Sequence, residues 1–253
     1  MDGYRSRMVK KISEVYELSP DDDRLISQHI TTLLDVKQFL RPREEKLDIM
    51  EGIIFGLKRR HGTTTERVQE RISITEEMLG SFRPTSILDI GAGTGEILTG
   101  LQIHYKPDKA YAIDFKLPKM KHLFQTLLYT KELTIPLPNE SVDLIVIFET
   151  LHHIHPKDRR NLLKEVARIL KPLGRCLISE HDDNESTAFY QFLELYHFFW
   201  YAANNEKVDP LYLMPREETM KEFRDVGLVS SNYHPRSGPN VQRIYHEVYT
   251  RQQ

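Results

Sequence analysis

The chain has 253 residues, a formal net charge of −2 and a single cysteine, Cys176. This length allows one α/β domain with an appendage, and the near-neutral charge excludes a broadly basic protein that wraps nucleic acid, though not an enzyme that grips one nucleotide or an RNA end. The lone cysteine excludes an intramolecular disulfide, and the apolar runs are too short to span a bilayer. We therefore expect a cytoplasmic protein without a membrane partner.

Residues 1–80 are predicted to be helical and to form an N-terminal subdomain. Apolar residues recur at helical spacing between 25 and 40 and between 44 and 60, and a last helix is expected at 66–79. Two clusters of basic side chains stand out in this part of the chain: Arg5, Arg7, Lys10 and Lys11, and then Lys58, Arg59, Arg60 and His61. Such clusters form either a solvated helix face or phosphate contacts near an active site.

Residues 87–96, ILDIGAGTGE, join a predicted buried strand to a predicted helix. Gly91, Gly93 and Gly95 allow positive φ angles and let a ligand lie against the main chain. The helix that follows directs unpaired N–H groups toward such a ligand. The next strand, 110–114, ends at Asp114, whose carboxylate either binds the same ligand or caps the following helix.

The spacing Asp89-x-Gly91-x-Gly93-x-Gly95, with Asp114 after the next strand, resembles motif I of the class I S-adenosylmethionine-dependent methyltransferases. It differs from the GxGxxG spacing of dinucleotide-binding folds. The resemblance covers about residues 84–250, and it implies that the glycine loop wraps the methionine part of the cofactor while Asp114 accepts both ribose hydroxyls. The cofactor-binding residues that it implies are Asp89, Gly91, Ala92, Gly93, Gly95, Asp114, Glu132, Phe148, Glu149 and His152. Glu132 stands where the family has an acid for the adenine amino group.

Predicted strands and helices alternate from residue 87 onward, as a doubly wound sheet requires. The strands are expected at 87–90, 110–114, 129–133, 143–148 and 175–179, with helices at 96–105, 117–128 and 156–170 and a turn at 171–174. Further helices are expected at 186–204 and 215–226, before two closing strands at 228–234 and 242–250. The predicted fold class is α/β: a doubly wound, seven-stranded, mostly parallel, Rossmann-like sheet in a methyltransferase domain of residues 81–253, which follows the helical subdomain of residues 1–80.

Ligands of such sheets bind beyond the carboxyl ends of the strands, so the residues after 90, 113, 148 and 179 should surround one pocket. Methyl transfer from a sulfonium is an in-line displacement, and much of its rate comes from positioning. Three signatures are missing after residue 148: the Asn/Asp-Pro-Pro-aromatic run of amino methyltransferases, the Pro-Cys nucleophile of cytosine-C5 enzymes and the Asp of ribose 2′-O enzymes. Guanine N7 remains as an acceptor, and so does an oxygen, nitrogen or carbon of a small molecule.

Two groups of residues are candidates for the acceptor site. In the aromatic segment 189–201, Tyr190, His197 and Tyr201 lie off the predicted apolar stripe, where they are candidates to stack on a flat base such as a cap guanine. After residue 179, Glu180 is a candidate acceptor for the guanine N1–H and amine, and His181 is a candidate for acid–base work or stacking. The alternatives are core packing for the aromatic residues and helix capping for the acids at 182 and 183.

The sequence Glu180-His181-Asp182 also resembles the "REHD" signature of a subset of viral methyltransferases. We therefore predict an S-adenosylmethionine-dependent methyltransferase that acts in mRNA capping, with capped RNA or a guanine cap analogue as partner and guanine N7 as acceptor. The alternative is a small-molecule O-, N- or C-methyltransferase, and a third possibility is a catalytically silent binding subunit. His152 and His153 are adjacent on a turn and do not make a preformed tetrahedral set, so no metal is expected.

Overall fold

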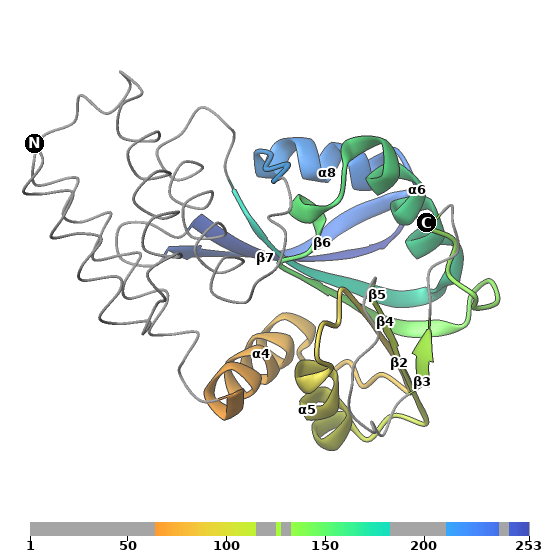
Figure 1. Cartoon of the computed structure of the whole chain (residues 1–253), viewed down its shortest axis with the longest axis vertical. Coiled ribbons are helices and arrows are strands. Elements are labelled where there is room, and N and C mark those ends of the chain that lie inside the picture. Colours follow the sequence, from red (N-terminus) through yellow and green to blue (C-terminus); the bar gives the residue numbers. More distant parts are fainter. Residues whose placement is uncertain (1–63, 115–124, 128–132, 183–210, 238–242, 253) are drawn as a thin grey trace, which may run out of the picture. The chain divides into compact units, whose positions relative to one another are not determined.

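The computed structural model describes residues 64–114, 125–127, 133–182, 211–237 and 243–252 (Figure 1). The predicted helices before residue 64 and the predicted helix at 186–204 lie outside these residues, so the N-terminal subdomain stays a prediction. Within the described part of the chain, seven strands form one sheet in the order β3-β2-β1-β4-β5-β7-β6. Neighbouring strands are parallel from β3 to β5, whereas β7 runs antiparallel to both β5 and β6.

The strands are β1 (Ser86–Ile90), β2 (Lys109–Ile113), β3 (Gln125–Leu127), β4 (Val142–Phe148), β5 (Leu170–His181), β6 (Leu228–Ser237) and β7 (Arg243–Arg251). The helices are α4 (Thr64–Leu79), α5 (Glu96–Tyr105), the 3-10 helix η1 (Leu151–His153), α6 (Pro156–Ile169) and α8 (Arg216–Arg224). The predicted α/β class, the mostly parallel sheet and the two closing antiparallel strands are therefore confirmed.

Two predicted local structures are wrong. Among the described residues the third strand is Gln125–Leu127, which the sequence placed at the end of a helix, and most of the strand predicted at 129–133 lies outside the described part of the chain. Within the described residues β3 pairs with three residues of β2, and three residues are too few to show a readable alternation of apolar and polar side chains. Residues 171–174, predicted as a turn, lie inside β5, where the register against β4 shifts between Val142 and Leu144. Such an irregularity accommodates Pro172 and Gly174 within a strand.

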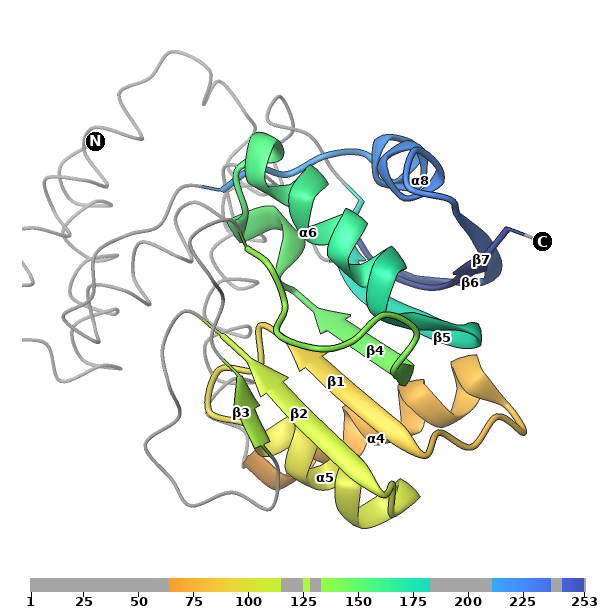
Figure 2. The ribbon, with the colours of Figure 1, turned by 90° about the vertical axis from the view of Figure 1, so that its right-hand side faces the viewer.

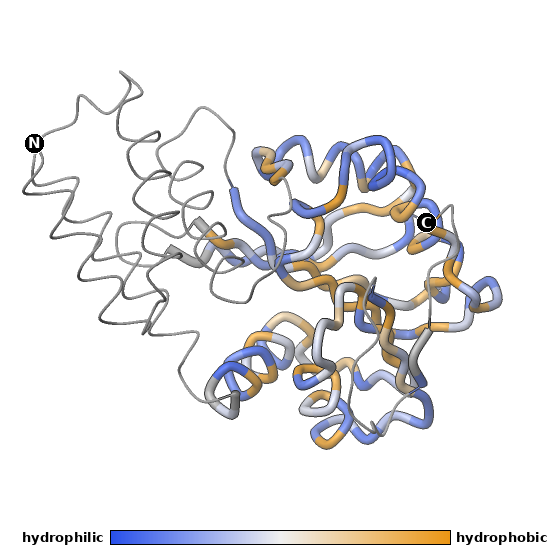
Figure 3. The backbone as a smooth tube through the Cα atoms, in the orientation of Figure 1, coloured by the Kyte–Doolittle hydropathy of each residue, from blue (hydrophilic) through white to orange (hydrophobic). Residues whose placement is uncertain are grey.

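Two layers of helices cover the sheet (Figure 2). α6 and α8 lie on one face, where Leu163 and Val166 of α6 belong to the same buried cluster as Ile145 of β4. α4 and α5 lie on the other face, where Met78 of α4 belongs to a second cluster with Val146. Neighbouring residues of β4 thus face opposite helical layers. This explains the unbroken apolar run of the strand, which stands out along the backbone in Figure 3.

α4 packs on α5 at a glycine. A Cβ on Gly100 of α5 would overlap the Cγ1 of Val68 in α4, so the two helices approach closely at this point. Met78 and Leu79 of α4 are 3% and 2% exposed in the core beneath. The sheet domain therefore includes α4, although the predicted boundary at residue 80 assigned this helix to the N-terminal subdomain.

We expect Gly100→Val to lower the free energy of unfolding by about 1–3 kcal/mol, because the added methyl groups overpack the contact with Val68. Urea denaturation measures this change. The matched control is Ile103→Ala on the same helix, where the side chain is 63% exposed and its truncation should change stability by less than about 0.5 kcal/mol. Equal effects of the two variants would contradict the close packing of α4 on α5.

Candidate functional site

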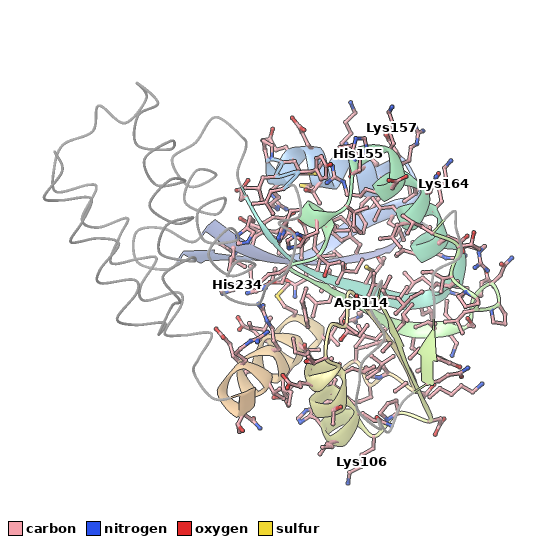
Figure 4. The ribbon with its side chains drawn as sticks, in the orientation of Figure 1. Lys106, Asp114, His155, Lys157, Lys164 and His234 are labelled. Carbon is pink, nitrogen blue, oxygen red and sulfur yellow. The ribbon has the colours of Figure 1, made fainter. Side chains whose placement is uncertain are left out.

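The glycine turn, residues 91–95, lies at the carboxyl end of β1 and is tied to the end of β2. The Gly91 N–H donates to the Ile113 carbonyl at 2.9 Å, and the Gly93 N–H donates to Asp114 Oδ2 at 2.8 Å. The φ angles of Gly91, Gly93 and Gly95 are 78°, 52° and 80°, a region that side-chain-bearing residues rarely adopt. The turn thus brings the half-buried Asp114 (labelled in Figure 4) beside the main chain of the glycines.

The two sides of this turn differ in how closely they are packed. A Cβ on Gly91 would overlap Thr150, which follows β4, so this glycine is fixed by crowding. A Cβ on Gly93 would meet no atom of the described residues within 4 Å. At Gly93 the turn therefore presents bare main chain, and it leads directly into α5, whose first N–H groups have no partner within the helix.

Asp89 lies inside β1, paired with Ala112 of β2 and Val146 of β4, and its side chain is 3% exposed. Burial, and secondly the charge of Asp114, raise the pKa of Asp89 to about 7. This carboxyl group therefore gains and loses its proton near neutral pH. The charges at the carboxyl end of β1 thus depend on pH in the physiological range.

A second buried acid organises the connection after β4. Glu180, 3% exposed at the carboxyl end of β5, accepts hydrogen bonds on Oε1 from the backbone N–H groups of Thr150 (2.8 Å) and Leu151 (2.9 Å). Its Oε2 lies 2.7 Å from Nδ1 of His152, and because a carboxylate only accepts, Nδ1 donates. Burial raises the pKa of Glu180, but attraction and hydrogen bonding by His152, helped by His181, outweigh it and hold the pKa below its usual range.

Glu180 is therefore ionised, and both of its oxygens are engaged by the chain itself. The sequence suggested instead that this carboxylate faces a bound guanine. The ring centroid of His181 lies 5.0 Å from that of His152, and both rings line one small cavity. Tyr212, Leu213 and Met214 line the same cavity from the segment that precedes α8. This is where the two predicted catalytic residues, Glu180 and His181, come together with His152.

α4 reaches the same edge of the sheet through Arg71, a residue that the sequence analysis missed. Its Nη1 donates to Ser179 Oγ at 2.9 Å, and its Nη2 donates to the Glu149 carboxylate. The guanidinium also lies 5.2 Å from the ring centroid of Phe148. Glu149 has a φ of 48° and donates its N–H to the Ser179 carbonyl. The predicted cofactor residues Phe148 and Glu149 are thus held by an arginine from another layer.

Arg159 of α6 is the second residue that the sequence analysis missed. It is 2% exposed and forms an ion pair with Glu222 of α8. A signal was present in the sequence, because residue 159 falls on the stripe that also holds Leu162, Leu163 and Val166. A charged side chain in that place requires buried partners.

The structure brings together most of the predicted cofactor residues: Asp89, Gly91, Ala92, Gly93, Gly95, Asp114, Phe148, Glu149 and His152. Glu132, Tyr190, His197 and Tyr201 lie outside the described residues. Among the residues that the structure describes, no three His, Cys, Asp or Glu side chains are grouped so that they could hold a metal ion. None of the described helices is long and apolar enough to cross a membrane.

Residues 88–178, less than half of the chain, match the sequence family described as "Methyltransferase domain". The chain is 30% identical over 132 residues to the 27-O-demethylrifamycin SV methyltransferase of Amycolatopsis mediterranei. This match covers 46% of this chain and 44% of that protein. It is 29% identical over 126 residues to the O-methyltransferase rstn1 of Aspergillus nomiae (46% and 54%), and 24% identical over 201 residues to the tRNA N(3)-cytidine methyltransferase METTL2 of Bos taurus (67% and 52%). The matches span about half the length of these relatives.

Two solved structures share the fold. The PH0226 protein of Pyrococcus horikoshii has a TM-score of 0.57 at 14% identity, over 74% of this chain and 91% of its own. The 1,6-didemethyltoxoflavin-N1-methyltransferase of Burkholderia thailandensis, solved with 1,6-didemethyltoxoflavin and S-adenosylhomocysteine, has a TM-score of 0.55 at 16% identity, over 86% and 94%. These likenesses confirm the predicted Rossmann-like α/β fold.

The raised pKa of Asp89 predicts a pH dependence of stability. Between pH 3.8 and about 7 the folded chain holds a proton that the unfolded chain releases, so this residue's contribution to stability is present at low pH and lost as pH rises through about 7. Asp89→Asn removes the titration. The measured quantity is the free energy of unfolding of the unmodified chain minus that of Asp89→Asn. This difference should fall by about 1.4 kcal/mol per pH unit in this window and then level off. Urea denaturation of both proteins at several pH values measures this, and a constant difference would contradict the buried acid.

Proposed function

We propose that this chain is a class I S-adenosylmethionine-dependent methyltransferase, and that its acceptor is a small molecule methylated on an oxygen or nitrogen that carries a proton. The family match at residues 88–178, the methyltransferase relatives and the shared fold support methyl transfer from S-adenosylmethionine. When bound, this cofactor supplies an electrophilic methyl group. The observation that carries the acceptor class is the buried pair of His152 and Glu180 at the carboxyl edge of the sheet.

The glycine turn holds the cofactor in this proposal. The Asp114 carboxylate lies one hydrogen bond from the Gly93 N–H, so ribose hydroxyls held by Asp114 bring the nucleoside against the bare main chain. The positive φ angles of the turn keep Cβ atoms out of the way of the ligand. Of the other cofactor contacts that the family resemblance implies, Phe148 and Glu149 lie at the carboxyl end of the neighbouring strand β4, and His152 follows in η1, where this proposal gives it a role toward the acceptor.

The pair of His152 and Glu180 has the arrangement of a general base and its orienting carboxylate. Since Nδ1 of His152 donates to Glu180, the lone pair of the imidazole is on Nε2. The ionised Glu180 is fixed by the Thr150 and Leu151 amides, and its bond to Nδ1 holds the orientation of the imidazole. The acceptor oxygen would bond to the methyl carbon as the methyl–sulfur bond breaks, and the acceptor proton would pass to Nε2.

Acceptors that lose no proton need no such base. Guanine N7 of an RNA cap attacks with a lone pair and loses no proton, and none of the relatives above is named for this reaction. The relative named for cytidine N3 of tRNA also uses a ring-nitrogen lone pair. Two of the relatives above have names that refer to methylation of an oxygen, in keeping with a hydroxyl acceptor. His181, at 5.0 Å from His152, is then part of the wall on the acceptor side.

We expect Asp114→Ala to weaken S-adenosylmethionine binding by about 100-fold, because it removes a charged acceptor of hydrogen bonds beside the turn. Isothermal titration calorimetry measures the dissociation constant. The matched control is Asp108→Ala, which changes an exposed aspartate just before the opposite end of the same strand and should leave binding unchanged. Full retention of binding in Asp114→Ala would move the cofactor to another place.

We expect His152→Asn to lower kcat by about 10²–10⁴-fold on an acceptor that loses a proton, because the general base is removed. The assay is transfer of a labelled methyl group to a panel of phenols, hydroxylated small molecules, tRNA and GpppA-capped RNA. His104→Asn is the matched control, because this exposed histidine lies in the last turn of α5, at the end of that helix away from the glycine turn. Transfer to capped RNA alone, with the same kcat in His152→Asn, would favour the guanine N7 acceptor instead.

A further inference from the structure

Arg159 joins four segments of the chain from a buried position. Its Nε and Nη2 donate to the two oxygens of Glu222 at 2.7 and 3.2 Å, which ties α6 to α8. Its Nη1 donates to two backbone carbonyls, those of Leu151 and Tyr212, both at 3.3 Å. Leu151 belongs to the connection that carries His152, and Tyr212 belongs to the segment that precedes α8.

The segment 211–214 contributes Tyr212, Leu213 and Met214 to the wall of the cavity beside His152. The Tyr212 N–H donates to the His152 carbonyl at 2.7 Å, and the Tyr212 ring meets His155 edge to face at 5.1 Å. Leu213 and Met214 line the same cavity as His152 and His181. The contact between the backbone of residues 151–152 and that of residue 212 therefore sets the distance between this wall and the imidazole of His152.

The guanidinium suits this junction because of its shape. It offers five N–H donors in one rigid plane, so it can bind a carboxylate with two bonds and still donate sideways to two carbonyls. A lysine ammonium in the same place has a single nitrogen, which cannot hold Glu222 and both carbonyls in one plane. The carboxylate of Glu222, 26% exposed, compensates the buried charge.

We infer that Arg159 is a positioning residue, which fixes the wall 211–214 against the connection 150–152 and so sets the width of the acceptor side of the site. This inference rests on the proposed function, because the wall matters for the reaction only if the acceptor lies beside His152. The hydrogen bonds of Arg159 go to Glu222, Leu151 and Tyr212, and none of these four bonds goes to the glycine turn or to Asp114. Its loss should therefore disturb acceptor binding while cofactor binding is kept.

The same helix offers a matched control. Arg168 of α6 forms two bonds to a carboxylate, that of Glu165, and donates to the backbone carbonyls of Ile135 and Leu137. It lies at the other end of α6 from His155, next to the segment before β4. Arg168→Lys therefore makes the same chemical change as Arg159→Lys, at a place remote from the cavity.

The first measurement needs no acceptor. In Arg159→Lys, hydrogen exchange of the Tyr212 amide, followed by NMR, should be about tenfold faster or more, while exchange of the Gly91 amide and the dissociation constant for S-adenosylmethionine stay within about twofold. Arg168→Lys should leave the Tyr212 amide unchanged. If Arg159→Lys does not fold, Glu222→Gln weakens the same fork and is read in the same way.

The second measurement uses the acceptor that the labelled-methyl panel identifies. Arg159→Lys should raise its KM by about tenfold with little change in kcat, and Arg168→Lys should change neither. Unchanged Tyr212 exchange in Arg159→Lys, equal acceleration in Arg168→Lys, or a loss of cofactor affinity as large as the rise in KM would each overturn the inference. Because the exchange experiment is independent of the acceptor, it still decides the positioning role if the panel contradicts the proposed acceptor class.

Discussion

The hydrogen bonds of one buried carboxylate, that of Glu180, hold together the connections at the carboxyl ends of the strands. Two backbone N–H groups of the connection after β4, at Thr150 and Leu151, end on Glu180, and the same carboxylate orients His152. Without it these donors would be buried without partners, which costs more than the bonds themselves contribute. Thr150 in turn packs against Gly91, and the His152 carbonyl receives the Tyr212 N–H. The glycine turn and the cavity wall thus take their places relative to this single group.

The two buried acids of the edge have opposite electrostatic roles. Asp89 is buried near another acid, Asp114, so its charged form is disfavoured. Glu180 is buried beside two histidines, so its charged form is stabilised. Equal burial therefore leads to different protonation at neutral pH, and the sign of the neighbouring charge decides between them. The acid in β1, near the glycine turn, and the acid at the end of β5, beside His152, therefore differ in protonation although both lie toward the same edge of the sheet.

The parts of the structure that are determined by residues close together in the sequence could be predicted. The glycine spacing and the apolar run of β4 are of this kind, and both the turn and the strand are confirmed. The bonds of Glu180 could not be predicted, because residues 150–152 meet it only after β4 and β5 have paired. Arg71 likewise meets Glu149 across layers, and β3 is too short for a pattern. Arg159 is intermediate: its place on an apolar stripe indicates burial, but its partners cannot be read from spacing.

Glu149 combines a left-handed backbone with a charge that pairs with Arg71. A glycine at this position would relieve roughly 1 kcal/mol of backbone strain. The same replacement would leave the guanidinium of Arg71, only 13% exposed, without its carboxylate at the mouth of the site. Because a largely buried guanidinium without its carboxylate costs more free energy than this strain, the left-handed acid stabilises the fold as a whole, and a descendant selected for thermal tolerance should retain it.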